Sequence, residues 1–167
     1  MDKYKPNRKE MHGNSEIAYS KVTKAPLGKQ GNNEFVDYMQ KAVKDVKFIQ
    51  ESVPENPDFK GLIKNENGQV APESGREWSS TSGIKTAPLQ TKMRHPERFM
   101  VGHPFNPVYL LPLVEICGGE KTSDAARQSA AEFYRNIGMK PLILRKEIDA
   151  FIADRLQEAV WREGLWL

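Results

Sequence analysis

The chain has 167 residues and a formal net charge of +3, with 25 Lys and Arg against 22 Asp and Glu. This surplus is too small to indicate nucleic acid or an anionic membrane as the main partner. The single cysteine excludes an internal disulfide and a cysteine-based structural zinc site, and we expect no metal. The first residues lack the apolar segment of a secretory signal, and no apolar run approaches the roughly 20 residues that span a bilayer. These features predict a cytoplasmic protein with no membrane partner.

The first half of the chain is mostly polar. Residues 1–32 have few apolar anchors, which predicts a loop-like or disordered segment. A helix is predicted after Asn33, because apolar residues recur there at helical spacing in Phe35, Met39, Val43 and Val46. The next apolar pair, at 48–49, predicts a short strand that ends at residues 50–52. Residues 53–77 are rich in Pro and Gly, which predicts at most a short helix near Phe59 to Ile63 and weak order over 64–77.

The second half carries stronger signals. Residues 99–101 predict a buried strand that ends at His103, and residues 109–116 form a second apolar segment. A helix capped by Thr122 or Ser123 is expected to end at Gly138, before a strand over 141–144 and a last helix capped by Asp149. This order predicts an α/β fold with parallel strands, whose ligands bind at the carboxyl ends of the strands.

Polar groups follow several of the predicted strands. His103 is a candidate general base, although a structural histidine in a turn is an equal alternative. Glu115 lies within an apolar run, so it either faces solvent by strand alternation or pairs with a buried base such as His103. The turn over residues 79–83 (SSTSG) offers hydroxyl donors to a ligand but is also an ordinary loop sequence.

The glycine fingerprint of dinucleotide sites is absent, because the sequence contains no G-x-G pair. A P-loop, a G-x-S-x-G motif and an H-E-x-x-H motif are absent as well.

Several ordered blocks, taken together, are far more specific than any one residue. They are SSTSG at 79–83, RHPER at 94–98, GHPFNPVYLLPLVEI at 102–116, FIQESVPEN at 48–56, FYRNIGMKPL at 133–142 and EIDAFIADRLQEAVWRE at 147–163. They resemble the 3-hydroxyacyl-CoA dehydrogenase family, and most closely its carnitine-oxidising members. The resemblance covers roughly residues 42–167, with a poorly matching gap at about 57–77.

The resemblance implies a fold and a division of the chain. Residues 1–41 would be a divergent polar segment without the family's first βαβ unit. Residues 42–145 would be the second part of a Rossmann-type NAD-binding domain. Residues 146–167 would contribute the first helix of an all-α C-terminal domain, which in the family contacts substrate and forms a homodimer. The chain then resembles the middle of an enzyme, in which residues 73–78 replace the usual strand before the serine-rich turn.

The resemblance also implies site residues and a reaction. His103 matches the catalytic base, Glu115 its acidic partner, and Ser82 the serine that contacts substrate and nicotinamide. Asp154 matches a substrate-contacting position that is Asn in acyl-CoA members, and the positions near the cofactor or the active site are Glu51, Asn56 and Asn106. The implied reaction is NAD-dependent oxidation of the 3-hydroxy group of carnitine or of a 3-hydroxyacyl-CoA.

Two other hypotheses remain open from the sequence. The missing glycine motif and the short C-terminal part are typical of a non-catalytic remnant of such an enzyme. The apolar residues of the last helix favour a piece that needs a partner to complete its fold.

Overall fold

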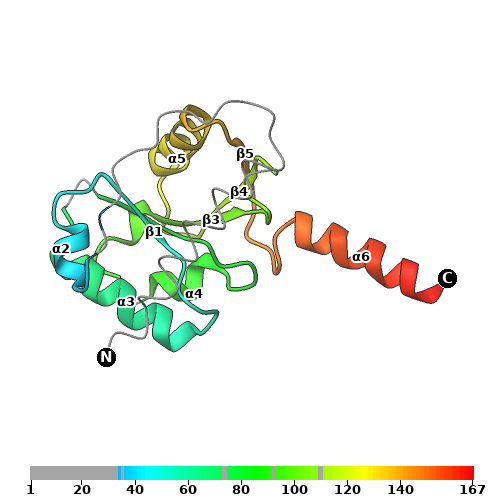
Figure 1. The fold of residues 1–167 in the computed structure, drawn as a ribbon, viewed down its shortest axis with the longest axis horizontal. Coiled ribbons are helices and arrows are strands. Elements are labelled where there is room, and N and C mark those ends of the chain that lie inside the picture. Colours follow the sequence, from blue (N-terminus) through cyan, green and yellow to red (C-terminus); the bar gives the residue numbers. More distant parts are fainter. Residues whose placement is uncertain (1–33, 35, 73–74, 92, 109–110) are drawn as a thin grey trace. The chain divides into compact units, whose positions relative to one another are not determined.

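The computed structural model describes residues 34, 36–72, 75–91, 93–108 and 111–167 (Figure 1). The chain separates into two units, of which the first contains residues 1–35 and 106–111. The second contains residues 36–105 and 112–167, and the description that follows concerns this unit. The predictions for residues 1–33 lie outside the described residues.

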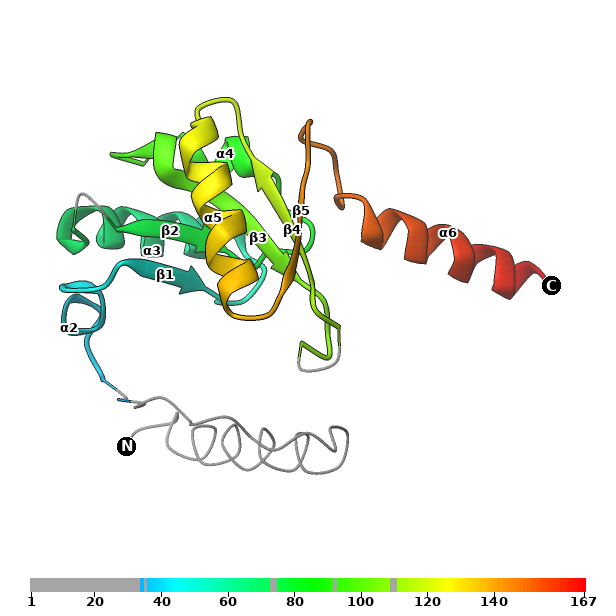
Figure 2. The same cartoon turned by 90° about the horizontal axis from the view of Figure 1, so that it is seen from above.

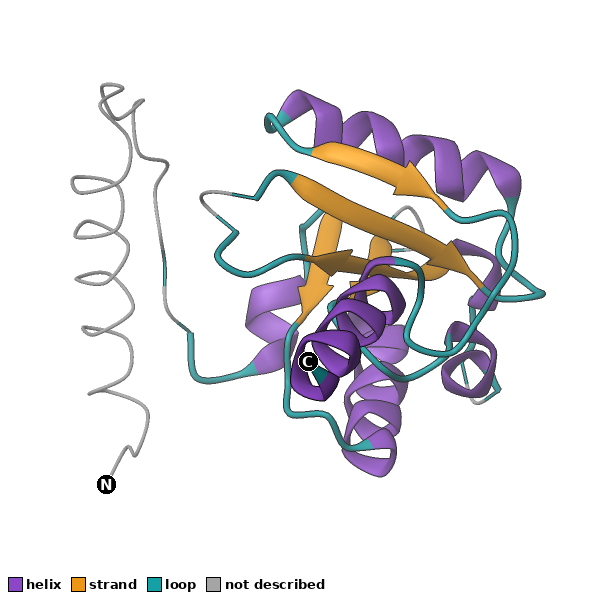
Figure 3. Ribbon diagram, turned by 90° about the vertical axis from the view of Figure 1, so that its right-hand side faces the viewer, coloured by secondary structure: helices purple, strands orange, loops and turns teal. Residues whose placement is uncertain are grey.

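A five-stranded sheet with the order β1-β2-β3-β4-β5 forms the centre of the second unit (orange in Figure 3). Its strands are β1 Phe48–Glu51, β2 Arg76–Ser79, β3 Phe99–Pro104, β4 Leu113–Gly118 and β5 Lys140–Ile143. The prediction of parallel strands is wrong for one pair, because β4 runs antiparallel to β3, whereas β1–β2, β2–β3 and β4–β5 are parallel. The antiparallel direction of β4 follows from its short connection to β3, because a parallel strand would need a longer crossover segment.

The two faces of the sheet carry different cores. Helix α5 (Asp124–Asn136) covers one face, and α3 (Pro57–Val70) lies on the opposite side (Figure 2). The α5 face contains a buried cluster in which strand residues such as Trp78 and Met100 pack against helix residues such as Tyr134. A second cluster on the other face holds Val101, Cys117, Leu144 and Phe151. The alternation of β3 and β4 side chains therefore assigns successive residues to separate cores.

One glycine in β3 allows α5 to approach the sheet. A Cβ at Gly102 would collide with the Tyr134 hydroxyl, whose O–H donates to Gln50 Oε1 at 2.8 Å. Burial raises the pKa of Tyr134 above its ordinary value, so this side chain stays protonated and keeps donating. The close packing fixes the backbone of β3 immediately before His103.

Helix α3 corrects the prediction of weak order over residues 64–77. The helix continues to Val70, and Asn56 caps its start by accepting from the Phe59 N–H at 3.0 Å. Its buried face carries Lys60 and Lys64, both 1% exposed, which pair with acidic groups of the sheet. The periodicity of hydrophobic residues does not predict this buried face of α3, because its buried residues are charged.

The segment predicted to be a poor strand is β2. Its residues 76–79 hydrogen-bond to β1 on one side and pair with β3 on the other, so β2 lies inside the sheet. Glu77 accepts from the Asn67 amide at 3.1 Å, and burial raises the pKa of its carboxyl group. Partners on α3 therefore make a polar sequence suitable for a central strand.

Shorter elements complete the unit, and the helix predicted after Asn33 is shorter than expected, because α2 begins only at Met39 and ends before Val46. They are α2 Met39–Val43, α4 Thr86–Gln90 and the 3-10 turn Pro96–Arg98. The α5 N-terminus is capped by Ser123, which accepts from the Ala126 N–H at 3.2 Å. Gly138, with φ +86°, follows the last turn of α5.

Helix α6 (Ala153–Trp166) begins differently from the prediction. Asp149 does not cap it, because this carboxylate pairs with Lys85 at 3.0 Å and the helix starts only at Ala153. Between them, Ala150 and Phe151 have φ of 56° and 49°, the left-handed region that favours glycine. The Phe151 side chain is fully buried, which holds this turn in place.

Among the described residues, no helix is long and apolar enough to cross a membrane.

The left-handed backbone conformation of Ala150 before α6 predicts how a glycine at this position would change the stability of the fold. Ala150→Gly should raise the free energy of unfolding by about 0.5–1 kcal/mol, because glycine adopts this φ without the steric cost that alanine carries. Thermal unfolding followed by circular dichroism measures the change. Ala125→Gly in α5 is the matched control and should lower stability, because its backbone is helical. A lower melting temperature for Ala150→Gly would contradict the assigned strain.

Candidate functional site

The β3–β4 pair brings His103 and Glu115 together. The two residues are directly opposite partners in the antiparallel register, and their side chains lie on the same face of the sheet. His103 Nδ1 is 3.1 Å from Glu115 Oε2. His103 is 6% exposed and Glu115 0% exposed. The structure therefore selects the buried pair over the solvent-facing alternative for Glu115.

The second oxygen of the Glu115 carboxylate holds the start of α6. Glu115 Oε1 accepts from the backbone N–H groups of Ile152 at 2.9 Å and Ala153 at 3.0 Å. These amides belong to the N-terminus of a helix, where the helix dipole favours a negative charge. Glu115 thus takes the capping position that the sequence assigned to Asp149, and it links the imidazole to α6.

Aromatic rings enclose the imidazole. The ring centroid of His103 is 4.8 Å from that of Phe105 and 5.5 Å from that of Phe151. These contacts restrict rotation of the imidazole, and the Glu115 contact sets which nitrogen faces the carboxylate. The second nitrogen, Nε2, lies 4.0 Å from Asp154 Oδ2 on the first turn of α6. That separation exceeds a hydrogen bond, and the Asp154 side chain is 30% exposed.

The serine-rich turn follows β2. Ser82 is exposed, and its two neighbours are held by one carboxylate, because Glu55 Oε1 accepts from the Thr81 hydroxyl and from the Gly83 N–H. Ser80 donates to the Ser52 hydroxyl at 3.0 Å. The turns that follow β1 and β2 therefore lie side by side at the carboxyl ends of two parallel strands.

Glu51 ends β1 in a buried polar network. Its carboxylate receives hydrogen bonds from Lys60 at 2.8 Å, Lys64 at 3.2 Å and Ser79 at 2.5 Å, and from the Val53 N–H at 2.7 Å. Burial by itself would raise the pKa of Glu51, but hydrogen bonds from Lys60 and Ser79 and the charge of Lys64 hold it below its ordinary value. Burial lowers the pKa of Lys64. The network occupies the Glu51 oxygens within the protein.

The two asparagines are placed differently. Asn56 is exposed at the N-terminus of α3, where its side-chain oxygen caps the helix. Asn106 is exposed and belongs to the first of the two units. The described residues of the site therefore form two groups. The first group is His103, Glu115 and Asp154, which lie close together. The second group lies at or after the carboxyl ends of β1 and β2 and consists of Glu51, Asn56 and Ser82.

Sequence reasoning missed Glu55, Lys60 and Lys64. The two lysines are four residues apart on a helix and share one face, and a helix cap at Asn56 precedes them. This spacing was a usable signal for a basic face directed at Glu51. Nothing in the sequence signals the reach of Glu55 to the turn beyond β2, because that contact spans 26 residues.

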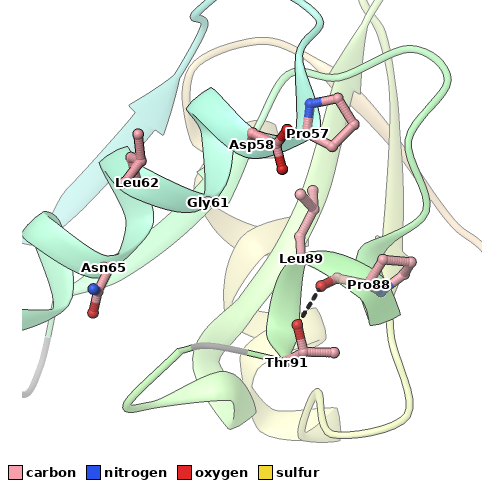
Figure 4. Close-up of a pocket in the computed structure, with 8 residues that line it drawn as sticks. All are labelled: Pro57, Asp58, Gly61, Leu62, Asn65, Pro88, Leu89 and Thr91. Carbon is pink, nitrogen blue, oxygen red and sulfur yellow. Dashed lines mark hydrogen bonds between the residues drawn. The ribbon is translucent and has the colours of Figure 1, made fainter.

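A separate groove lies between α3 and α4 (Figure 4). None of the candidate site residues lines it. The lining residues are Pro57, Asp58, Gly61, Leu62, Asn65, Pro88, Leu89 and Thr91. Among the described residues, no group of three or more His, Cys, Asp and Glu side chains could hold a metal ion.

Known proteins resemble the chain in sequence. It is 53% identical over 151 residues to L-carnitine dehydrogenase of Mesorhizobium japonicum. The aligned region covers 90% of this chain and 42% of that protein. It is 52% identical over 133 residues to L-carnitine dehydrogenase of Oceanobacillus iheyensis, covering 80% of this chain and 43% of the relative. The chain spans less than half the length of these relatives.

Solved structures resemble it as well. A structure of 5-formyl-3-hydroxy-2-methylpyridine 4-carboxylic acid 5-dehydrogenase, an NAD+ dependent dismutase, matches with a TM-score of 0.86 at 27% identity. The match covers 96% of this chain and 52% of that one. A structure of (S)-3-hydroxybutyryl-CoA dehydrogenase from Ralstonia eutropha matches with a TM-score of 0.68 at 28% identity, over 75% of this chain and 47% of the other.

A family model completes the comparison. The model described as "3-hydroxyacyl-CoA dehydrogenase, NAD binding domain" matches residues 8–148, which is most of the chain. The mixed five-stranded α/β sheet agrees with that domain. The chain therefore belongs to the 3-hydroxyacyl-CoA dehydrogenase family and carries the family's NAD binding domain.

Proposed function

We propose that this chain carries the proton-accepting centre of an NAD-dependent dehydrogenase that oxidises a 3-hydroxy group. The buried contact between His103 Nδ1 and Glu115 Oε2 carries the proposal. When Nδ1–H donates to the carboxylate, Nε2 keeps its lone pair and is able to take the hydroxyl proton of a substrate. Glu115 then stabilises the imidazolium that forms, and its own position is fixed by the α6 amides.

The side chains at the carboxyl ends of β1 and β2 fit NAD in their chemistry. Ser82 and Asn56 are exposed neutral groups that donate and accept hydrogen bonds, as the amide and ribose of the cofactor require. When bound, NAD supplies the acceptor for the hydride. We propose that Ser82 and Asn56 contact the cofactor, and that Glu51 lies near it and supports the loop after β1.

Asp154 favours a cationic substrate of the carnitine type over an acyl-CoA thioester. Its carboxylate lies 4.0 Å from His103 Nε2, the atom proposed to take the proton. In carnitine the quaternary ammonium is attached to the carbon next to the one that carries the hydroxyl. A substrate hydroxyl at His103 would therefore bring its ammonium close to Asp154, where opposite charges attract.

The base is tested by removing its imidazole. His103→Ala should abolish NADH formation from carnitine and NAD, because the group proposed to accept the hydroxyl proton is then lost. Glu115→Gln should lower kcat by about 10²–10⁴-fold while leaving the affinity for NAD unchanged. Absorbance at the NADH band measures turnover, and calorimetry measures NAD binding. Glu97→Gln, an exposed carboxylate, is the control.

Two results would contradict the proposal. Turnover retained by His103→Ala would exclude the base, and the wild-type chain failing to bind NAD at millimolar concentration would exclude the cofactor and favour a non-catalytic role.

Substrate choice is tested at Asp154. Asp154→Asn should lower kcat/KM for carnitine by at least about 10-fold, while kcat/KM falls less for 3-hydroxy-5,5-dimethylhexanoate, which keeps the carboxylate and has carbon in place of the ammonium nitrogen. The ratio of the two values isolates the ammonium contact from general damage. Glu158→Gln, an exposed carboxylate on the same helix, should leave the ratio unchanged. An unchanged ratio for Asp154→Asn would contradict the proposed contact.

We also propose that the chain forms a homodimer through α6. None of the residues of α6 is buried, and several of its apolar side chains are exposed, including Leu156 at 64%, Val160 at 74% and Leu165 at 75%. Light scattering should give twice the chain mass, and Leu156→Glu should return the mass to that of one chain. A wild-type monomer would contradict this part of the proposal.

A further inference from the structure

The segment that joins β5 to α6, residues 144–152, contacts the residues that follow the serine-rich turn. Glu147 Oε1 accepts from the Ala87 N–H at 2.8 Å, in the first turn of α4. Two residues further along this joining segment, Asp149 Oδ1 lies 3.0 Å from Lys85 Nζ. Both partners in α4 and its approach lie shortly after Ser82 in the chain. The joining segment is therefore bound to the end of the turn that carries this serine.

The two contacts differ in strength. The side chains of Lys85 and Asp149 are 38% and 76% exposed, and an exposed ion pair of this kind contributes little. Glu147 is partly buried, and its carboxylate accepts from a backbone N–H, which is a stronger type of hydrogen bond than one between neutral groups. Glu147 is therefore the main link between the two segments.

Both ends of this link lead back to the same strand. The Thr86 hydroxyl donates to the Cys117 carbonyl of β4 at 2.8 Å, and both residues are buried, so the first turn of α4 is fixed to the sheet. At the other end of the joining segment, Glu115 of β4 accepts from the Ile152 and Ala153 amides. The contacts form a closed ring that starts and ends on β4, and the Glu147 hydrogen bond closes it.

The ring contains backbone that does not hold its conformation by itself. Ala150 and Phe151 have φ of 56° and 49°, which is unfavourable for residues other than glycine and persists only where the surroundings hold it. The buried Phe151 side chain anchors this turn on the side of α6. Glu147 anchors it on the side of β5. Asp154 follows directly in the first turn of α6, so its position depends on both anchors.

We propose that Glu147 is a positioning residue for the reaction, because it ties the end of the Ser82 turn to the start of α6 and so sets the placement of Ser82 relative to Asp154. The inference rests on the proposed function, in which Ser82 contacts the cofactor and Asp154 the substrate. Glu147 touches neither ligand and acts through the backbone on both sides of its hydrogen bond. Hydride transfer needs both ligands in one geometry, so a small displacement lowers the rate without weakening the binding of either.

Hydrogen exchange tests the link without activity. In Glu147→Ala the Ala87 amide should exchange at least about 10-fold faster than in wild type, because its acceptor is lost. The Ile152 and Ala153 amides should also exchange faster, although their own acceptor, Glu115, is unchanged. Faster exchange at Ala87 alone would reveal a local contact and overturn the positioning role. Unchanged exchange at Ala87 would overturn the contact itself.

Two further variants control the exchange experiment. Glu147→Gln keeps an oxygen acceptor of the same reach but without the charge, so the three amides should exchange at rates between those of wild type and Glu147→Ala. Glu132→Ala removes an exposed glutamate on α5 and should leave all three amides at wild-type rates. If a circular dichroism melt shows that Glu147→Ala does not fold, Glu147→Gln decides the question, and wild-type rates in that variant would overturn the link.

Steady-state kinetics test whether the link acts on the reaction. Glu147→Ala should lower kcat for carnitine by about 10-fold and leave the Kd of NAD unchanged, because the cofactor keeps its own contacts. Glu147→Gln should restore part of the kcat. In an Asp154→Asn background, Glu147→Ala should cost less, because the contact that it places is already absent.

The kinetic outcomes separate this inference from the proposed function. An unchanged kcat in Glu147→Ala, or an equal cost with and without Asp154→Asn, would overturn the positioning role. Wild-type protein without turnover would contradict the proposed function, and the exchange measurement would still decide the link.

Discussion

The buried carboxylate of Glu115 is the interaction on which the candidate site depends. A fully buried charge is costly unless hydrogen bonds compensate it. Three groups do so here, namely the His103 imidazole and the amides of Ile152 and Ala153. These partners come from β3 and from the start of α6, so the one carboxylate sets the orientation of the imidazole and the entry of the last helix.

A second buried polar set organises the opposite edge of the sheet. Glu51 joins Ser79 of β2 to Lys60 and Lys64 of α3, and Glu77 joins β2 to Asn67. Breaking such a network at one member leaves a charge unpaired, which is far more costly than the net value of the pairs. The network explains why a polar segment forms an ordered helix and strand, and it supplies the anchor for the loop that contacts the serine-rich turn.

Sequence patterns located most elements but not their pairing. Strands β1, β3 and β5 and helix α5 with its Ser123 cap were predicted, because their apolar periodicity and caps are local signals. The full length of helix α3 and the order of strand β2 were not, because their stability comes from ion pairs and hydrogen bonds between residues that are far apart in the sequence. The antiparallel direction of β4 was missed for a related reason, since strand direction depends on the connection and not on the strand itself.

The sequence by itself determined the family and selected the candidate site residues, because those residues lie in contiguous blocks around His103, Glu115 and Ser82. Only the tertiary structure decided that Glu115 faces His103, because strand alternation alone left both faces open and the register of β3 with β4 had to be fixed. It also decided that Glu55 reaches the Ser82 turn. Contacts between distant segments depend on packing and on compensation of buried charge, which no local pattern records.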